Sequence, residues 1–565
     1  MFKKNHFSPI FIAITALLAL TPAIGHAFAL PQSIQNAAIT ARKQAQFAQV
    51  MIGALIKHAR GKTLDHLKIE QKLAQLYSKE YTPEQLSHQL NQAITNNKLV
   101  ANYVDKHGFS IGASSSAYQI EGGLDDSSAA ARFYKNKVQL PTAGDAIDFY
   151  HRYPNIIKQM KEELNINTFR ISLAWDRIQP QQNVFDMDAI AYYKDVIRTL
   201  LAHNIKPLVV FHHYDVPTWF EDLGGFELLE NGELFKQFCL KVYTELAEEL
   251  GDCLISMCCA PEGPAFKGYY TGEGTPGEKN NLQKAHMVIA NMYYQLVDTA
   301  LDMQKLYTQL KKTNTNIKKP FIGTQINVVF LDPHHSTQTT FKDRLKTALG
   351  CAMGSYIQSG GTFNFLVDGH YCMYTPGADF MKDAKAINVY RYHPHAHKAF
   401  DWIGVNIYSN RFMNGFKPIA NGELIEQDEE RYTDNPNYRN YPEGIYRAVQ
   451  LITEHVAKPL GLPVIVTENG IATKDNAKRT RYFQRALTTI TALVNDGYPV
   501  IGYLPWTSHD NFEWPTQDKP DGFGAKCYGF FAVNFDKNSP NYLQATLKEG
   551  SRFYAHFAQS FFATA

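Results

Sequence analysis

The seven cysteines of this 565-residue chain lack the spacing of a zinc site, and their number is odd. At least one thiol therefore has no disulfide partner within the chain. A chain of this length can bury a large core and does not need a disulfide framework. We therefore expect Cys253, Cys258, Cys259 and the other cysteines to be mostly buried, as small apolar residues are.

The chain also lacks an excess of charge of one sign. Its 56 Lys and Arg residues nearly balance 54 Asp and Glu residues, which leaves a net charge of +2, and no basic stripe stands out. This balance argues against nucleic acid as a partner. No short internal repeat or low-complexity tract occurs, and the 45% hydrophobic and 13% aromatic content is typical of a globular enzyme with a substantial core.

The N-terminal apolar stretch, residues 9–20, is too short to span a bilayer comfortably. Lys3 and Lys4 precede it, and small residues at 25–27 and 27–29 form possible cleavage sites. Residues 1–29 therefore predict a cleavable signal peptide, and we expect a periplasmic or secreted protein with no further membrane contact. An uncleaved membrane anchor is the alternative.

Residues 30–106 differ in composition from the rest of the chain. They are rich in Ala, Gln, Lys and Leu, contain no Trp, and show apolar residues at helical spacing. Thr82-Pro83-Glu84-Gln85 is typical of a capped helix start, with Thr82 as the N-cap. The pattern predicts about three helices, which form a small α-helical extension before the main domain at 107–565.

From residue 107 onward, β-rich apolar runs alternate with helical stretches. Eight such repeats predict an α/β fold of the TIM (β/α)8 barrel type. Polar or acidic residues follow most of the runs, as expected when the carboxyl ends of the strands carry a functional site. The predicted strands are 109–113, 167–172, 207–213, 254–259, 320–328, 402–406, 463–468 and 500–506.

The seventh of these runs ends in Glu468, followed by Asn469-Gly470. Five more motifs accompany Thr467-Glu468-Asn469-Gly470, at 109–122, 169–180, 213–217, 406–408 and 502–514. Taken together and in this order, they resemble the motifs of family 1 glycoside hydrolases, the β-glucosidase family. One departure is Tyr214, which stands where that family has Trp.

The resemblance implies a retaining β-glycosidase that needs no cofactor and no metal. Glu468 matches the nucleophile that forms the covalent glycosyl-enzyme, and Arg170 and Tyr408 match the residues that flank it. A cation and a phenol donor at these positions would keep Glu468 ionised. Retention also requires a second carboxyl group about 5–5.5 Å from the first, which protonates the leaving oxygen and then activates water.

The resemblance further implies that the ligand is a small β-linked sugar or glycoside. Amide, imidazole and carboxylate groups can bind sugar hydroxyls, while an indole ring stacks on the sugar face. A 6-phosphate would meet Glu513 with like charge, which favours unphosphorylated β-glucosides. The residues matching substrate-binding positions are Gln119, His213, Asn406, Trp506, Glu513 and Trp514.

The acid/base position departs from the family pattern, which is Asn-Glu-Pro at the end of the fourth strand. Here the chain has Cys259-Ala260-Pro261-Glu262. Alignment from downstream places Ala260 on the catalytic Glu and Cys259 on the Asn, whereas alignment from upstream places Glu262 on the catalytic Glu. We prefer the first register because it also matches Pro261 and the two residues at 265–266. In this register Glu262 is the remaining candidate for the acid/base and lies just beyond the strand.

Two alternatives to hydrolysis follow from this departure. General acid–base catalysis contributes about 10²–10⁴-fold, so its loss would impair the enzyme severely. The barrel could then act as a carbohydrate- or protein-binding module, as klotho-type members of the family do. Alternatively, it could be a transglycosidase or cleave only activated aglycones, as myrosinase-like members do.

Overall fold

The computed structural model describes residues 32–59, 65–334, 340–376, 386–419, 429–435, 437–517 and 519–563. The predicted signal peptide at 1–29 lies outside the described residues. Within those ranges, none of the helices combines the length and the apolar character that a membrane crossing requires.

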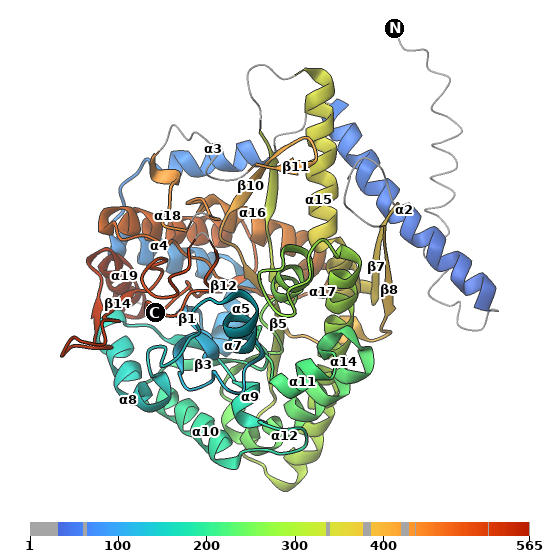
Figure 1. Ribbon diagram of the computed structural model, residues 1–565. Coiled ribbons are helices and arrows are strands. Elements are labelled where there is room, and N and C mark those ends of the chain that lie inside the picture. The colour runs from blue at the N-terminus through green and yellow to red at the C-terminus, as the bar shows by residue number, and fades with distance from the viewer. Residues whose placement is uncertain are drawn as a thin grey trace, which may run out of the picture.

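Eight parallel strands close into a central barrel (Figure 1), which confirms the predicted TIM-type fold. Their order around the barrel is β1-β13-β12-β9-β5-β4-β3-β2. Each strand overlaps one of the eight predicted runs, and only Ser114 of β1 and Lys206 of β3 lie outside them. The strands are β1 (Ser110–Ser114), β2 (Thr168–Ser172), β3 (Lys206–Val210), β4 (Leu254–Ser256), β5 (Phe321–Asn327), β9 (Trp402–Asn406), β12 (Val464–Glu468) and β13 (Val500–Tyr503).

The strand register gathers polar side chains at the carboxyl ends of the strands. Glu468 of β12 pairs with Asn406 of β9, and Asn406 also pairs with Asn327 of β5. On the opposite side of the barrel, Ser114 of β1 pairs with Arg170 of β2. Because all eight strands are parallel, the segments that follow them meet at one end of the barrel.

Three barrel strands end three residues before their predicted boundaries. β3 ends at Val210, β4 at Ser256 and β13 at Tyr503, although the apolar runs continue to 213, 259 and 506. The additional residues lie beyond the barrel strands and include His213, Cys259 and Trp506. These residues are buried at the mouth of the barrel and therefore resemble strand residues in composition, although they do not belong to a strand.

Helices surround the barrel on the outside, as Figure 1 shows. The strands are consequently buried on both faces, and β1, β2, β9 and β12 have no exposed residue. The long outer helices are α8 (Phe149–Gln159), α10 (Met187–Ala202), α12 (Gly232–Leu250), α14 (Leu282–Thr313), α15 (Phe341–Asp368), α16 (Glu443–Ile452), α18 (Asn476–Asn495) and α19 (Arg552–Ala563).

The loops between these elements contain short helices and small sheets. The short helices are α6 (Ala117–Ile120), α7 (Ala129–Arg132), α9 (Trp175–Ile178), α11 (Thr218–Asp222), α13 (Glu262–Phe266) and α17 (Lys458–Leu460). The sheets, which the sequence patterns did not predict, are formed by β6 (Phe330–Pro333), β10 (Asn410–Asn414) and β11 (Lys417–Pro418), by β7 (His370–Thr375) and β8 (Ile387–Tyr392), and by β14 (Phe531–Val533) and β15 (Ala545–Leu547).

The N-terminal extension is helical, as predicted, with four helices rather than about three among the described residues: α2 (Gln32–Ala59), α3 (Asp65–Tyr77), α4 (Pro83–Asn96) and α5 (Lys98–His107). Thr82 caps α4, and its hydroxyl accepts a hydrogen bond from the Gln85 backbone as the motif predicts. The extension packs on the outer layer of the barrel. The Asn97 amide donates to the carbonyl of Val494 on α18 at 2.9 Å, and Lys43 donates to Asn388 of β8 at 2.7 Å.

All seven cysteines are free thiols, and all except the partly exposed Cys351 are buried. This agrees with the expectation that they act mainly as small apolar residues.

His286 of α14 is a buried histidine whose neutral form the fold requires. Its Nδ1 lies 2.8 Å from the Tyr371 hydroxyl, and its Nε2 has no partner. Burial lowers the pKa of His286 to about 3, whereas in the unfolded chain a histidine titrates near 6.5. As the pH falls below about 6.5, the unfolded chain therefore takes up a proton that the folded protein excludes, and the fold loses stability.

We expect a His286→Phe substitution to remove this pH dependence. The variant should be less stable than the parent at pH 7, and the difference should shrink by about 2 kcal/mol at pH 5, at about 1.4 kcal/mol per pH unit. Urea unfolding of both proteins at the two pH values measures this change. A stability difference that does not change with pH would contradict the assignment.

Candidate active site

Glu468 is the last residue of β12, and only 7% of its surface is exposed. Its carboxylate is held by three side chains from different strands or strand ends. The Oε1 atom lies 2.5 Å from the Arg170 guanidinium and accepts a hydrogen bond from the Cys259 thiol at 3.1 Å. The Oε2 atom accepts from the Tyr408 hydroxyl at 2.8 Å. The sequence predicted the Arg170 and Tyr408 contacts, and the structure brings both residues to Glu468.

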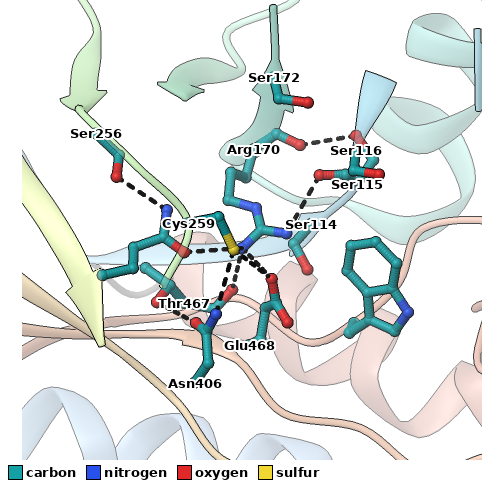
Figure 2. Close-up of polar contacts among 12 residues, drawn as sticks. Ser114, Ser115, Ser116, Arg170, Ser172, Ser256, Cys259, Asn406, Thr467 and Glu468 are labelled. Atoms are coloured by element: carbon teal, nitrogen blue, oxygen red, sulfur yellow. Dashed lines mark hydrogen bonds and ion pairs between the residues drawn. The ribbon is translucent and has the colours of Figure 1, made fainter. Parts of the chain in front are cut away.

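Arg170 is fully buried and is fixed by further bonds (Figure 2). Its guanidinium donates to the Gln325 side chain at 2.9 Å and to the backbone carbonyl of Ser115 at 3.2 Å. Burial by itself would lower the pKa of Arg170, but Glu468, together with Cys259 and Tyr408, raises it above its usual value. The Arg170 guanidinium is therefore a permanent positive charge beside Glu468.

His213 and Asn406 also lie beside this carboxylate. Burial and the nearby Arg170 charge lower the pKa of His213 well below its usual value, so the imidazole is neutral at pH 7. Asn406 accepts from the Thr467 hydroxyl at 2.7 Å and donates to Cys259 Sγ at 3.4 Å. The amide of Asn406 is thus oriented by its neighbours.

The remaining predicted sugar-binding residues form a second group around Trp506. The Trp506 indole donates to Glu513 Oε1 at 2.7 Å, and the Arg170 guanidinium lies 5.6 Å from the Trp506 ring centre. Burial raises the pKa of Glu513 to about 7, although the Trp506 hydrogen bond opposes this effect. The Gln119 amide donates to the carbonyl of Phe512 at 2.7 Å, which ties it to the same loop. Trp514 is partly exposed and stacks on Tyr118 at 5.4 Å.

Ala260, in the preferred alignment, occupies the position of the family's general acid. It is fully buried, and its backbone has a φ of +47°, a left-handed conformation that side chains with a Cβ rarely adopt. A methyl group cannot transfer a proton, so position 260 supplies none of this chemistry.

Glu262 begins α13, and only 2% of its surface is exposed. Its Oε1 atom accepts hydrogen bonds from Tyr293 of α14 at 2.8 Å and from Thr362 of α15 at 3.0 Å. Burial raises the pKa of Glu262 to about 7, against the effect of these two hydrogen bonds. Within the described residues, no hydrogen bond or ion pair links Glu262 to the group around Glu468. In this structure the carboxylate of Glu262 contacts the outer helices.

Lys267 is a cation near the site that the sequence motifs did not indicate. Its ammonium lies 5.9 Å from the ring centre of Tyr214 and 5.6 Å from that of Trp514. Burial lowers its pKa to about 8, and the Lys526 charge adds to this effect, whereas Glu513 and Glu468 oppose it. Cys259 was likewise aligned with the family's Asn without any expectation that its thiol would contact Glu468. Lys267 and Cys259 both follow β4, where the sequence departs from the family motif and therefore did not predict their contacts.

Comparison with known proteins supports a single family. The model of glycosyl hydrolase family 1 matches residues 103–561. Beta-glucosidase 32 of Arabidopsis thaliana is 25% identical over 512 residues, which cover 80% of this chain and 88% of that protein. Beta-glucosidase A of Acetivibrio thermocellus is 25% identical over 484 residues, which cover 78% of this chain and 95% of that protein.

Solved structures show the same fold. A beta-glycosidase from Pyrococcus horikoshii is 25% identical with a TM-score of 0.62, and the match covers 80% of this chain and 94% of that one. A beta-glucosidase from Thermotoga maritima in complex with deoxynojirimycin is 20% identical with a TM-score of 0.62, covering 80% and 98%. Because the family model spans most of the sequence and the barrel carries the family's motifs at its strand ends, this chain belongs to glycosyl hydrolase family 1.

Proposed function

We propose that the protein is a retaining β-glycosidase that attacks β-glucosides with Glu468. The observation that carries this proposal is the carboxylate of Glu468 at the end of β12, which neighbouring side chains hold on both oxygens. Arg170 supplies a permanent counter-charge at 2.5 Å, and Tyr408 donates to the other oxygen at 2.8 Å. A carboxyl group that is oriented by two neighbours and only slightly exposed suits attack on an anomeric carbon.

In the proposed reaction, a Glu468 oxygen bonds to the anomeric carbon while the bond to the aglycone oxygen breaks. The electron pair leaves with that oxygen, and the product is a covalent glycosyl-enzyme. Water then attacks the same carbon, loses a proton that ends on the departed aglycone oxygen through solvent, and releases Glu468 as a carboxylate, so two inversions retain the configuration. Both steps benefit from a proton-transferring group.

Position 260 lacks such a group, and Glu262 is engaged by Tyr293 and Thr362. We therefore propose that the enzyme favours substrates whose leaving group needs little protonation. The same observation supports the second candidate, a barrel that binds a sugar or a protein without hydrolysing it. Transfer to an acceptor other than water would be a third outcome of the same chemistry.

For the sugar itself, we propose an unphosphorylated glucose or a related β-linked unit. Glu513 and the Trp506 indole, linked at 2.7 Å, offer a carboxylate and a stacking face. A phosphate group beside Glu513 would add like charge where Glu513 is ionised. The relatives named beta-glucosidases are consistent with this choice.

We further propose export to the periplasm or the medium, on the basis of the sequence of residues 1–29. Detection of a shortened N-terminus by mass spectrometry after expression in a bacterium would test this. Recovery of the protein with residues 1–29 intact would contradict it.

Glucose should protect the protein against thermal unfolding, even if turnover is slow. A ligand that binds only the folded state at 100 times its Kd stabilises it by about 2.7 kcal/mol. Trp506→Ala should weaken glucose binding by roughly tenfold, or about 1.4 kcal/mol, because it removes the stacking face. Trp506→Phe, which keeps an aromatic ring but loses the bond to Glu513, should be less affected. Equal protection of Trp506→Ala and the parent in a thermal shift titration would show that the sugar binds elsewhere.

A further inference from the structure

Three potential metal ligands of different chemistry meet at the carboxyl ends of the barrel strands. His213, Cys259 and Glu468 each offer a ligand atom, and these atoms lie within 4.8 Å of one another. Their exposed fractions are 8%, 0% and 7%. The residues are far apart in the sequence and converge because each follows or ends a barrel strand.

We propose that His213, Cys259 and Glu468 form a binding site for a thiophilic divalent cation such as Zn²⁺. A nitrogen, a sulfur and a carboxylate oxygen are the ligand types that Zn²⁺ takes in proteins. Three protein ligands leave a fourth tetrahedral position open, as in zinc sites that bind water or substrate. Small shifts of the side chains suffice, because zinc–ligand distances of about 2.0–2.3 Å place the ligand atoms somewhat less than 4.8 Å apart.

The ligand atoms are available for this role. Of the two His213 ring nitrogens, either of which can bind a metal ion, Nδ1 is buried and has no hydrogen-bond partner, which is costly unless a ligand satisfies it. The Cys259 thiol already points at Glu468 Oε1, to which it donates at 3.1 Å. A metal ion would take the place of the thiol proton between these two residues.

Neighbouring side chains orient the ligands, as outer residues do in metal sites. Tyr408 donates to Glu468 Oε2 at 2.8 Å, and Asn406 donates to Cys259 Sγ at 3.4 Å. Figure 2 shows Cys259 between Asn406, Arg170 and Glu468. The sulfur and carboxylate are therefore held in place before any ion binds.

Arg170 opposes a cation here, since its guanidinium lies 2.5 Å from Glu468 Oε1. This repulsion acts on every cation and is offset only where the ion gains a thiolate bond. Mg²⁺ and Ca²⁺ prefer six or more oxygen ligands, and this site offers one carboxylate. The arrangement therefore selects thiophilic ions over hard ones.

Metal binding and attack by Glu468 exclude each other, because both use the same carboxylate. This consequence rests on the proposed function, whereas the metal site does not. A bound ion would inhibit the glycosidase reversibly, and removal of the ion by a chelator would restore it.

The test uses Co²⁺ as a spectroscopic probe on the full chain after treatment with a chelator. Co²⁺ bound to a thiolate gives a charge-transfer band in the near ultraviolet. We expect the parent to develop this band with one Co²⁺ per chain, and Zn²⁺, but not the same concentration of Mg²⁺, to abolish it. No band at saturating Co²⁺, or displacement by Mg²⁺, would overturn the proposal.

Substitutions of the proposed ligands test whether these residues bind the Co²⁺ that produces the band. Cys259→Ser and Cys259→Ala should each lose it, while His213→Ala should weaken Co²⁺ binding by at least about tenfold. Cys258→Ala is the matched control, because Cys258 is adjacent and equally buried but does not belong to the group of three ligand residues. A band that persists in both Cys259 variants would overturn the site.

The readout also separates this proposal from the glycosidase proposal. Covalent labelling of Glu468 by a 2-deoxy-2-fluoro-β-glucoside with an activated leaving group tests the catalytic role. If Co²⁺ binds as described but this glucoside does not label Glu468, the metal site stands and the catalytic role of Glu468 fails. If Glu468 is labelled but no band forms, the catalytic role stands and the metal site is overturned. Where both hold, Zn²⁺ should slow the labelling of Glu468, and unchanged labelling at saturating Zn²⁺ would contradict a shared carboxylate.

Discussion

A 2-deoxy-2-fluoro-β-glucoside with an activated leaving group should become attached covalently to Glu468. Attack by the carboxylate on such a reagent needs little assistance from a general acid, so the absence of a carboxyl group at position 260 should not prevent it. The fluorine slows the second step, so the adduct accumulates. Peptide mapping by mass spectrometry after incubation should place the added mass on the peptide that contains Glu468.

Two variants test whether the adduct depends on Glu468. Glu468→Gln should abolish the adduct, because the amide is a poor nucleophile of the same shape. Glu262→Gln should keep it, since Glu262 contacts Tyr293 and Thr362 rather than the group around Glu468. Absence of an adduct in the parent at saturating reagent would remove the main support for catalysis and favour the binding-module alternative.

Azide should accelerate the turnover of an aryl β-glucoside with a good leaving group. It is a small anion that attacks the glycosyl-enzyme without needing a general base, so it replaces the slow attack by water. The bond between the anomeric carbon and Glu468 breaks, and the product should be a β-glucosyl azide because the second inversion restores the starting configuration. The gain can approach the contribution of a general base, about 10²–10⁴-fold or roughly 3–5 kcal/mol of barrier.

Glu262→Gln tests whether Glu262 supplies the missing function. We expect the substitution to leave the parent's rate and its response to azide nearly unchanged. If Glu262 were the acid/base, the substitution would cost about 10²-fold or more on substrates with poor leaving groups, and azide would rescue only the variant. A parent that hydrolyses unactivated disaccharides without azide, and loses this activity in Glu262→Gln, would overturn our alignment of Ala260 with the acid/base position.

The sequence was sufficient to predict the barrel because the signal for each strand is local. Residues 464–467 are all β-branched and the first three are apolar, and the structure has β12 at Val464–Glu468. Such runs indicate a strand buried on both faces, and eight of them in alternation with helices leave few other folds. The same locality predicted the capped start of α4 at Thr82.

Strand ends were less predictable from the sequence, for a physical reason. Residues 257–259 are as apolar as β4 itself, since they are buried at the mouth of the barrel, yet they lie outside the strand. A hydrophobic pattern indicates that residues are buried, but it does not indicate whether their backbone still forms hydrogen bonds to the adjacent strand. This is why the predicted fourth strand was too long.

The sequence alone determined the fold, the family and the position of Glu468 at a strand end, because these depend on local composition and on motifs in a fixed order. The roles of the site residues remain predictions. Only the tertiary structure decided where the side chains after β4 point. Glu262 contacts α14 and α15, Lys267 approaches Tyr214 and Trp514, and Cys259 lies close to both His213 and Glu468. These contacts join residues far apart in the sequence, 209 positions in the case of the bond from Cys259 to Glu468, so no local pattern encodes them.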